Sequence, residues 1–171
     1  MLVFWYTSAM SRRIEGIELE ELQGIVNAAI DVAKTSTCMR DHRGAVVFRD
    51  NEILGSASNG PLSPYECDIE KCGNVCGIYA MHAERLSIIK ALESRHDLSG
   101  ASVVHVRIGE DNHVQVSGDL RCEDCTGYMV RVGRNKKGMK LKEFILLQKN
   151  GWTAYEITEA DEETRKNLGL I

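Results

Sequence analysis

The chain has 171 residues, a formal net charge of -4, and hydrophobic and charged fractions of 43% and 27%. These values are typical of one globular domain with a sizeable core. The acidic balance argues against binding of duplex nucleic acid, which needs a basic surface, and no apolar run approaches the roughly 20 residues that span a membrane.

The N-terminal stretch, residues 1–17, predicts a loosely specified arm on a single domain that spans 1–171. Its opening, MLVFWYTSAM, is apolar but short, and it lacks the basic region of a secretory signal. We therefore expect a cytoplasmic protein whose six cysteines stay reduced. Reduced cysteines that cluster indicate metal binding.

The first half of the domain predicts a helix, a hairpin and a long loop. Apolar residues recur at helical spacing over about 18–35, which is typical of an amphipathic helix. Two short apolar runs within 44–58 flank a turn at 49–51 and predict a β-hairpin. Residues 59–77 hold both prolines, three cysteines and three glycines. They predict a loop of a length that is usually functional or pinned in place.

The second half alternates between helical and strand patterns. The expected elements are a helix at 79–95, strands at 101–108 and 113–117, a helix at about 122–133, strands at 143–148 and 152–157, and a helix at 159–168. This order predicts an α/β domain in which helices cover a mixed sheet.

Two short motifs, each at the start of a predicted helix, carry side chains that bind metals. His82 opens one helix, and the segment from Cys122 to Cys125 opens the other. Because both helices follow strands, we expect their N-termini to emerge at the same end of the sheet, where free N–H groups and the helix dipole favour thiolates. One imidazole and two thiolates leave the fourth position of a tetrahedral zinc ion open, which is typical of a catalytic site.

Glu84 follows His82 by two residues, beside the metal without binding it. Zinc lowers the pKa of a bound water to about 7, and a carboxylate at this place can take the proton and pass it to a substrate. Taken alone, His82 could be a core histidine, and Cys122 with Cys125 could be a redox pair or half of a structural zinc site. Together, in this order, the motifs indicate a zinc-dependent nucleobase deaminase with Glu84 as the general acid and base.

The chain resembles the cytidine/deoxycytidylate deaminase superfamily over about residues 36–148. MHAERLSIIKAL resembles the HAE helix of that family, RCEDC its PCxxC segment, and STCMRDHRGAVVFRDNEILGSASNGP its first hairpin, in a form closest to the deoxycytidylate branch. The resemblance implies a three-layer α/β/α fold with a mixed central sheet of about five strands. It also implies a homo-oligomer, Asn59 beside the substrate sugar, and a backbone at Ala83 that helps to position the base.

The chain departs from the family in two places. Arg121 stands where the family usually has proline, and it can adopt the φ that proline imposes. Near the metal pocket Arg121 could reach a substrate phosphate, or it could be an exposed arginine. The segment 105–120 is also longer than the simple link between strand and PCxxC.

A second metal site is predicted from the other four cysteines. Some deoxycytidylate deaminases carry a structural zinc on cysteines that look equivalent to Cys38 and Cys67, completed by histidines. Here Cys72 and Cys76 could complete a closed set of four thiolates, which would hold the long loop in order. The alternatives are free thiols or three cysteines with His42. The remaining histidines show no spacing typical of metal ligands.

The function predicted from these features is that of an enzyme, a hydrolase that releases ammonia from a small-molecule cytosine nucleotide, with dCMP to dUMP as the first choice. One alternative keeps the chemistry on another base, a nucleoside or a polynucleotide. Another alternative, of a different class, is a catalytically inactive zinc-binding protein. Glu84 argues against it, because a purely structural site has no need of that carboxylate.

Overall fold

The computed structural model describes residues 11–70, 72, 79–133 and 140–171. Its helices are α1 (Gly16–Ala33), α3 (Ala83–Glu93), α4 (Glu123–Gly133) and α5 (Ile157–Asn167). The longer strands are β2 (His42–Arg49), β3 (Glu52–Ser58), β6 (Ser102–Ile108), β8 (Glu143–Gln148) and β9 (Gly151–Glu156). Pairs of residues form β1 (Arg12–Arg13), β4 (Gly60–Pro61), β5 (Ala80–Met81) and β7 (Val114–Gln115).

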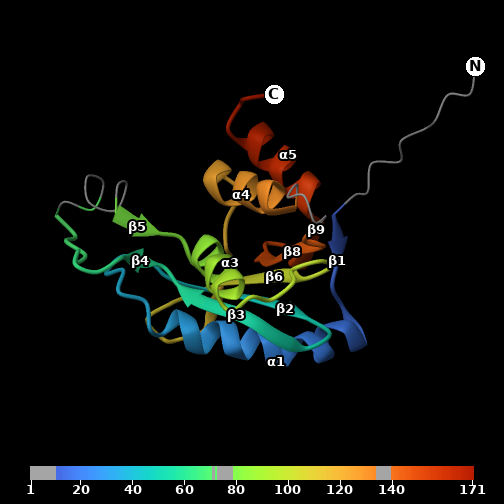
Figure 1. The fold of residues 1–171 in the computed structure, drawn as a ribbon, viewed down its shortest axis with the longest axis horizontal. Coiled ribbons are helices and arrows are strands. Elements are labelled where there is room, and N and C mark those ends of the chain that lie inside the picture. Colours follow the sequence, from blue (N-terminus) through green and yellow to red (C-terminus); the bar gives the residue numbers. More distant parts are fainter. Residues whose placement is uncertain (1–10, 71, 73–78, 134–139) are drawn as a thin grey trace, which may run out of the picture.

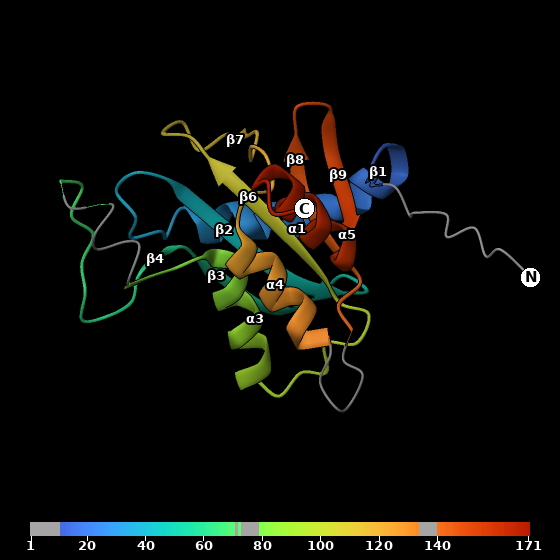
Figure 2. The same cartoon turned by 90° about the horizontal axis from the view of Figure 1, so that it is seen from above.

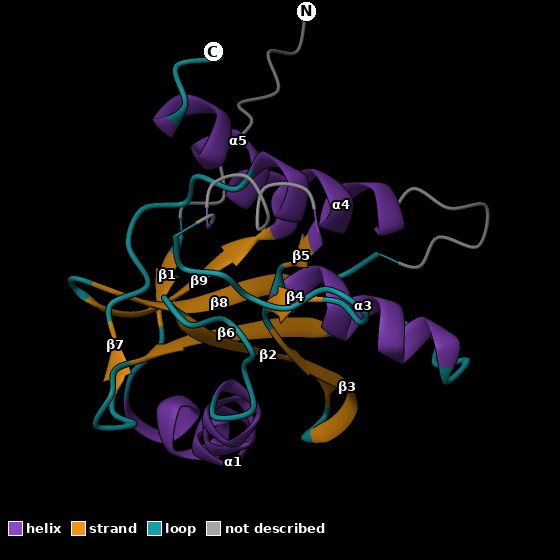
Figure 3. Cartoon of the chain, turned by 90° about the vertical axis from the view of Figure 1, so that its left-hand side faces the viewer, coloured by secondary structure: helices purple, strands orange, loops and turns teal. Residues whose placement is uncertain are grey.

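Helices cover both faces of the sheet, with α1 on one side and α3, α4 and α5 on the other (Figures 1 and 3). The alternation of side chains along each strand fills both layers, since neighbouring residues point to opposite faces. Val46 of β2 packs in the core under α1, whereas Ala45 and Val47 pack in the core under α3 and α4. The predicted three-layer α/β/α fold with a mixed sheet is therefore confirmed. None of the helices in the described ranges has the length and apolar character that crossing a membrane requires.

The large sheet has seven strands within the described residues, in the order β1-β9-β8-β6-β2-β3, with β7 beside β6. The pairing of β6 with β8 is parallel, and β6 pairs with β2 in the antiparallel sense. The five longer strands match the number of about five that the resemblance implies. Strand β7 lies within the strand predicted at 113–117, and the two-residue strand β1 was not predicted.

The predicted N-terminal arm is ordered at its inner end, which corrects the expectation of a loose segment up to residue 17. Arg12 pairs with Ala154 across β1 and β9, and its guanidinium holds Glu143 at 2.9 Å. Helix α1 also begins at Gly16, two residues before the predicted start. The first ten residues lie outside the described ranges.

Helix α3 begins at Ala83 and not near residue 79, because the preceding residues are extended. Ala80 and Met81 pair with Pro61 and Gly60 in a separate two-stranded sheet, β4-β5. His82 continues this extended backbone, with φ of -73° and ψ of 145°, as the N-cap of α3. The strand that leads into α3 is therefore β5, from the end of the long loop, and not a strand of the large sheet.

Helices α1 and α3 approach the sheet at glycines, which lets their backbones come close to it. A Cβ on Gly55 of β3 would collide with Ser87 O of α3 and lie 2.7 Å from Ala91 N. Gly44 of β2 lies equally close to α1. The absence of a side chain at Gly55 therefore sets the height of α3, and with it the position of His82 and Glu84.

We predict that Gly55→Ala lowers the free energy of unfolding by about 1–3 kcal/mol, because the added methyl group must push α3 away from β3. Gly24→Ala is the matched control, since Gly24 is exposed on α1 and a Cβ there meets nothing within 4 Å. Alanine should stabilise that helix by up to about 1 kcal/mol. Urea unfolding curves measure both changes, and an equal stability of the two variants would contradict the steric argument.

Candidate active site

The predicted metal ligands converge between α3 and α4. His82 Nδ1 lies 3.1 Å from the Sγ atoms of both Cys122 and Cys125, and the two sulfur atoms are 2.9 Å apart. Within the described residues these three side chains form the one group of histidine, cysteine or acidic residues placed to hold a metal ion. Residues separated by about 40 positions in the chain are thus brought together as the motifs predict.

Both ligand segments sit at helix N-termini. His82 is the N-cap of α3, and Cys122 directly precedes α4, where its carbonyl accepts the backbone N–H of Thr126 at 3.1 Å. The N–H of Cys125 also donates to Cys122 Sγ at 3.3 Å. Figure 2 shows the two helices side by side on the same face of the sheet. The free N–H groups and positive dipole ends of both helices therefore favour negative charge on the ligands.

In the absence of a metal ion the negative charge of the cysteine pair resides on Cys122, because the hydrogen bond with Cys122, together with burial, raises the pKa of Cys125. Hydrogen bonding with Cys125, opposed by burial and reinforced by His82, lowers the pKa of Cys122 to about 5. A thiolate, and not a thiol, is the form of cysteine that binds metals. One imidazole nitrogen and the two sulfur atoms of Cys122 and Cys125 match the ligand types of zinc in three-ligand catalytic sites. The donor set therefore fits a zinc ion with one open coordination position.

Glu84 lies beside the ligands but outside the group that they form. It is on the first turn of α3, 7% exposed, with Oε2 at 3.9 Å from Cys125 Sγ. Its other oxygen, Oε1, lies 3.7 Å from His105 Nε2. A buried carboxylate next to an open metal position has the place of a proton carrier, as predicted for Glu84.

A cavity of about 410 Å³ opens onto this group. Volumes of this size are typical of small-molecule sites. His82, Glu84, Cys122 and Cys125 line one side of it, and Leu120, Thr126, Phe144 and Leu146 add a mainly apolar floor. A planar ring of the size of a nucleobase would find apolar contact and polar side chains in the same space.

One wall of the cavity is a network of charged residues. Asp41 accepts hydrogen bonds from Arg43 and Arg107 at 2.7 and 2.8 Å. Burial raises the pKa of Asp41, but the charges and hydrogen bonds of the two arginines outweigh this effect, so the pKa lies below its ordinary value. The ion pairs hold the beginning of β2 against β6 at the mouth of the cavity.

Asn59, predicted beside the substrate sugar, lines the cavity. Its amide oxygen accepts from Ser36 Oγ and from the Arg43 N–H, each at 2.8 Å, and its amide nitrogen donates to Asp41 O at 2.9 Å. These bonds tie three segments together, so Asn59 also braces the wall of the cavity. Ala83, the other residue expected at the base, is fully buried between His82 and Glu84.

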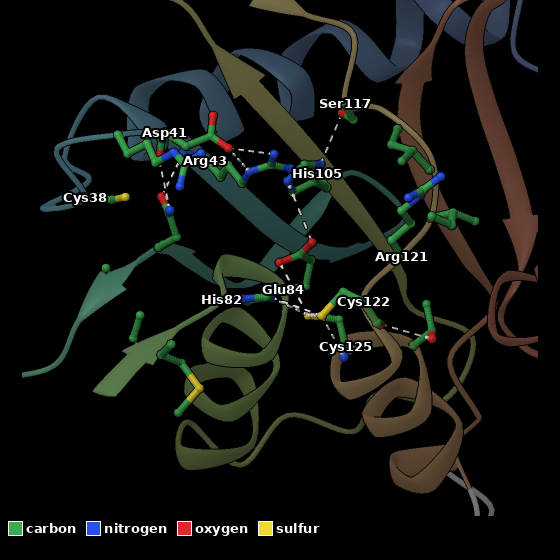
Figure 4. A pocket seen from close by; sticks show the side chains of 18 of the residues that line it. Cys38, Asp41, Arg43, His82, Glu84, His105, Ser117, Arg121, Cys122 and Cys125 are labelled. Atoms are coloured by element: carbon green, nitrogen blue, oxygen red, sulfur yellow. Dashed lines mark hydrogen bonds and ion pairs between the residues drawn. The ribbon is translucent and has the colours of Figure 1, made fainter. Parts of the chain in front are cut away.

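Arg121 lines the cavity from the segment before α4, and its side chain is 65% exposed. Its guanidinium makes a long ion pair of 3.6 Å with Asp119. Figure 4 shows Arg121 and the Asp41–Arg43 pair on opposite sides of Glu84. The structure thus places Arg121 at the rim, where its guanidinium stays accessible from the cavity.

The predicted second metal site is not assembled from the cysteines that the structure describes. Cys38 is buried and lies apart from His82 and Cys122 in Figure 4, and Cys67 Sγ accepts the N–H of Met39 at 3.3 Å. Cys38, Cys67 and Cys72 do not form a group of three ligand atoms. Cys76 lies outside the described residues, so the four-cysteine site stays a prediction.

Several cavity residues carry no motif and were not predicted as site residues. His105 and Ser117 lie behind Glu84, and Asp41 and Arg43 form the wall. A signal for His105 was present, because it is the one ionisable residue within the apolar run from Ala101 to Val106. No sequence pattern marks Ser117, because it is placed at the site by the path of residues 105–120 and by its backbone hydrogen bond to Leu147.

The comparisons with known proteins found likeness among solved structures. No family model matches the chain, and no curated protein matches its sequence. A dCMP deaminase from the cyanophage S-TIM5, in complex with dCMP and dUMP, matches with a TM-score of 0.54 and 21% identity, covering 76% of this chain and 81% of that one. The apo form of the same enzyme matches with a TM-score of 0.50 and 23% identity, over 70% and 79% of the two chains.

A cytidine deaminase from Burkholderia pseudomallei matches with a TM-score of 0.55 and 14% identity, covering 81% of this chain and 94% of that one. At these identities the likeness concerns the fold, and it extends over most of each chain. The chain therefore shares the α/β/α fold of these deaminase structures, and it carries a His-Cys-Cys group at two helix N-termini.

Proposed function

We propose that this protein is a zinc-dependent hydrolytic deaminase of a cytosine nucleotide, with dCMP as the preferred substrate and dUMP and ammonia as products. One observation carries the proposal. His82, Cys122 and Cys125 supply three ligands to a metal ion, while the buried carboxylate of Glu84 lies within 3.9 Å of one ligand sulfur and belongs to no ligand set. A structural zinc site is closed by four ligands and needs no such carboxylate.

Different side chains of the cavity have different roles in the proposed reaction: metal binding, proton transfer and contact with the base. His82, Cys122 and Cys125 would hold the zinc, which when bound makes water nucleophilic near neutral pH. Glu84 takes one proton of the attacking water and delivers it to the ring nitrogen. It then takes the proton of the hydroxyl group that has been added to the ring carbon and delivers it to the amine, which leaves as ammonia while the carbonyl group of the product forms. The apolar floor at Phe144 and Leu146 holds the ring and limits the access of bulk water.

The choice of a nucleotide substrate is supported by charge and by the comparisons. Arg40, Arg43 and Arg121 line the cavity, and guanidinium groups are well suited to bind phosphate. Arg43 is engaged by Asp41 at 2.6 Å, whereas the contact of Arg121 with Asp119 is long and exposed. We assign the phosphate to Arg121, which directly precedes the proposed ligand Cys122 in the chain. The matching phage enzyme was crystallised with dCMP and dUMP, and the bacterial one is a cytidine deaminase.

We expect Glu84→Gln to lower kcat for the nucleotide substrate by at least about 100-fold, because the amide cannot carry the proton. The variant should keep its fold and its zinc, since Glu84 is not a ligand. The measurement is ammonia release from a panel of cytosine, cytidine, deoxycytidine, CMP, dCMP and dCTP. A variant with undiminished turnover would remove Glu84 from the mechanism. A wild-type protein that binds zinc and turns over nothing in the panel or in single-stranded DNA would favour the inactive zinc-binding protein.

Removal of a ligand should remove a zinc ion. We expect His82→Ala and Cys125→Ser each to hold one zinc fewer per chain than the wild type, measured by elemental analysis of the purified protein. Glu84→Gln is the control and should match the wild type. The wild-type value also tests the site predicted at Cys38, Cys67, Cys72 and Cys76, because two zinc ions per chain require a second site. Equal zinc content in all variants would contradict the assignment of the ligands.

The role of Arg121 predicts a change that depends on the phosphate. Arg121→Ala should raise KM for dCMP by about 10- to 100-fold, the loss expected for hydrogen bonds to a charged group. KM for deoxycytidine, which has no phosphate, should stay as in the wild type. Arg131→Ala is the control, because Arg131 lies in the last turn of α4 and does not line the cavity. An unchanged KM for dCMP would show that Arg121 is only an exposed arginine.

We also propose that the protein forms a homo-oligomer and that it is located in the cytoplasm. These two proposals rest on the family resemblance and on reduced cysteines. Sedimentation of the purified protein and fluorescence imaging of a tagged chain in cells measure them directly.

A further inference from the structure

His105 occupies an unusual place for an ionisable side chain. It lies in the middle of β6, is 2% exposed, and is flanked by the fully buried Val104 and Val106. The alternation of the strand turns His105 toward the face of α3 and α4, together with Val103. A polar ring at such a position is costly unless its nitrogen atoms find partners. The partners of His105 therefore indicate why the ring is there.

The two ring nitrogens face two different groups. Nδ1 lies 3.3 Å from Ser117 Oγ, and Nε2 lies 3.7 Å from Glu84 Oε1. Nε2 is buried and has no hydrogen-bond partner within normal hydrogen-bond distance among the described residues. Figure 4 shows Ser117, His105 and Glu84 in a line that leads to the metal ligands. Contacts of this kind are often long in ligand-free enzymes and tighten in the reacting complex.

The protonation of the ring follows from its surroundings. Burial lowers the pKa of His105, and the opposing charge of Glu84 does not cancel this effect, so the ring is neutral near neutral pH. A neutral imidazole has one donor and one acceptor, whereas a carboxylate can only accept. Both contacts are satisfied when Nε2–H points at Glu84 and Nδ1 accepts the hydroxyl hydrogen of Ser117. In the other tautomer a lone pair on Nε2 would face the carboxylate.

We propose that Ser117 and His105 position the carboxylate of Glu84, with Ser117 Oγ–H donating to Nδ1 of His105 and Nε2–H of His105 donating to Glu84 Oε1. This inference rests on the proposed deaminase function. Holding Oε1 leaves Oε2 on the side of Cys125, one of the three proposed metal ligands, at 3.9 Å from its sulfur atom. A carboxylate held in one orientation is ready to carry protons, whereas a misplacement of about 1 Å can cost about 100-fold in rate.

The long segment between β6 and α4 contributes Ser117, the partner of His105 Nδ1, to this arrangement. Ser117 follows β7, and its backbone N–H donates to Leu147 O of β8 at 2.8 Å. The segment is therefore tied to the large sheet where its serine meets His105. The extra length relative to a direct link supplies the residue that selects the tautomer of the histidine.

Variants at His105 test the inference through kcat. His105→Leu removes the donor and should lower kcat by about 10- to 100-fold on the substrate that the wild type turns over, with KM and zinc content unchanged. His105→Gln keeps a donor and should recover at least part of that loss. Ser117→Ala should give a smaller loss, and the double variant with His105→Leu should be no slower than His105→Leu alone. Wild-type kcat in His105→Leu, no gain in His105→Gln, or additive losses in the double variant would overturn the proposal.

The tautomer can be measured without any turnover. Nitrogen-15 NMR of the histidine rings in the zinc-loaded wild type, with His105→Gln used to assign the signal, should find the proton of His105 on Nε2 at neutral pH. A proton on Nδ1, or on both nitrogens, would overturn the proposal even if a variant failed to fold. A wild type that turns over no nucleotide would refute the proposed function alone, because the NMR result stands independently of activity.

Discussion

Two helix N-termini, those of α3 and α4, meet at one point above the sheet, and the candidate site depends on that meeting. Each terminus contributes at its cap position a ligand side chain, His82 or Cys122, and the positive ends of both dipoles favour thiolate sulfur there. The close approach of α3 to Gly55 fixes one of the termini relative to the sheet. Arg85 of α3, which stacks 5.5 Å from the ring centre of Tyr128 in α4, joins the helices further along. The packing of α3 against the sheet and against α4 therefore determines where the metal ligands lie relative to one another.

The elements and side chains that follow from local sequence patterns could be predicted from the sequence alone. Helical periodicity predicts α1, and alternation predicts the hairpin of β2 and β3. The spacing of His82, Cys122 and Cys125 predicts the metal group, and the place of Glu84 two residues after His82 predicts the carboxylate beside it. Each depends on residues close in the chain or on a motif whose chemistry requires a given set of side chains.

Features that depend on distant partners were not predictable in the same way. The start of α3 was placed four residues too early, because the pairing of Ala80 with Pro61 across the long loop overrides the local helical pattern. The ordering of Arg12 depends on Glu143, more than a hundred residues later in the chain. The bracing of Asn59 likewise depends on Ser36 and Arg43, which lie 23 and 16 residues earlier in the chain.

His105 illustrates why a site residue can escape a reading of motifs. A search for metal ligands passes over it, because its spacing to other histidines and cysteines has no meaning for a metal. The informative feature is the conflict between a polar ring and its immediate surroundings in the strand, since Val103, Val104 and Val106 are all fully buried. Natural sequences are locally consistent where only stability matters, and they break that consistency mainly at functional sites. A buried ionisable side chain in an apolar strand is therefore a reason to ask which catalytic group lies on the same face of the sheet, and here that group is Glu84.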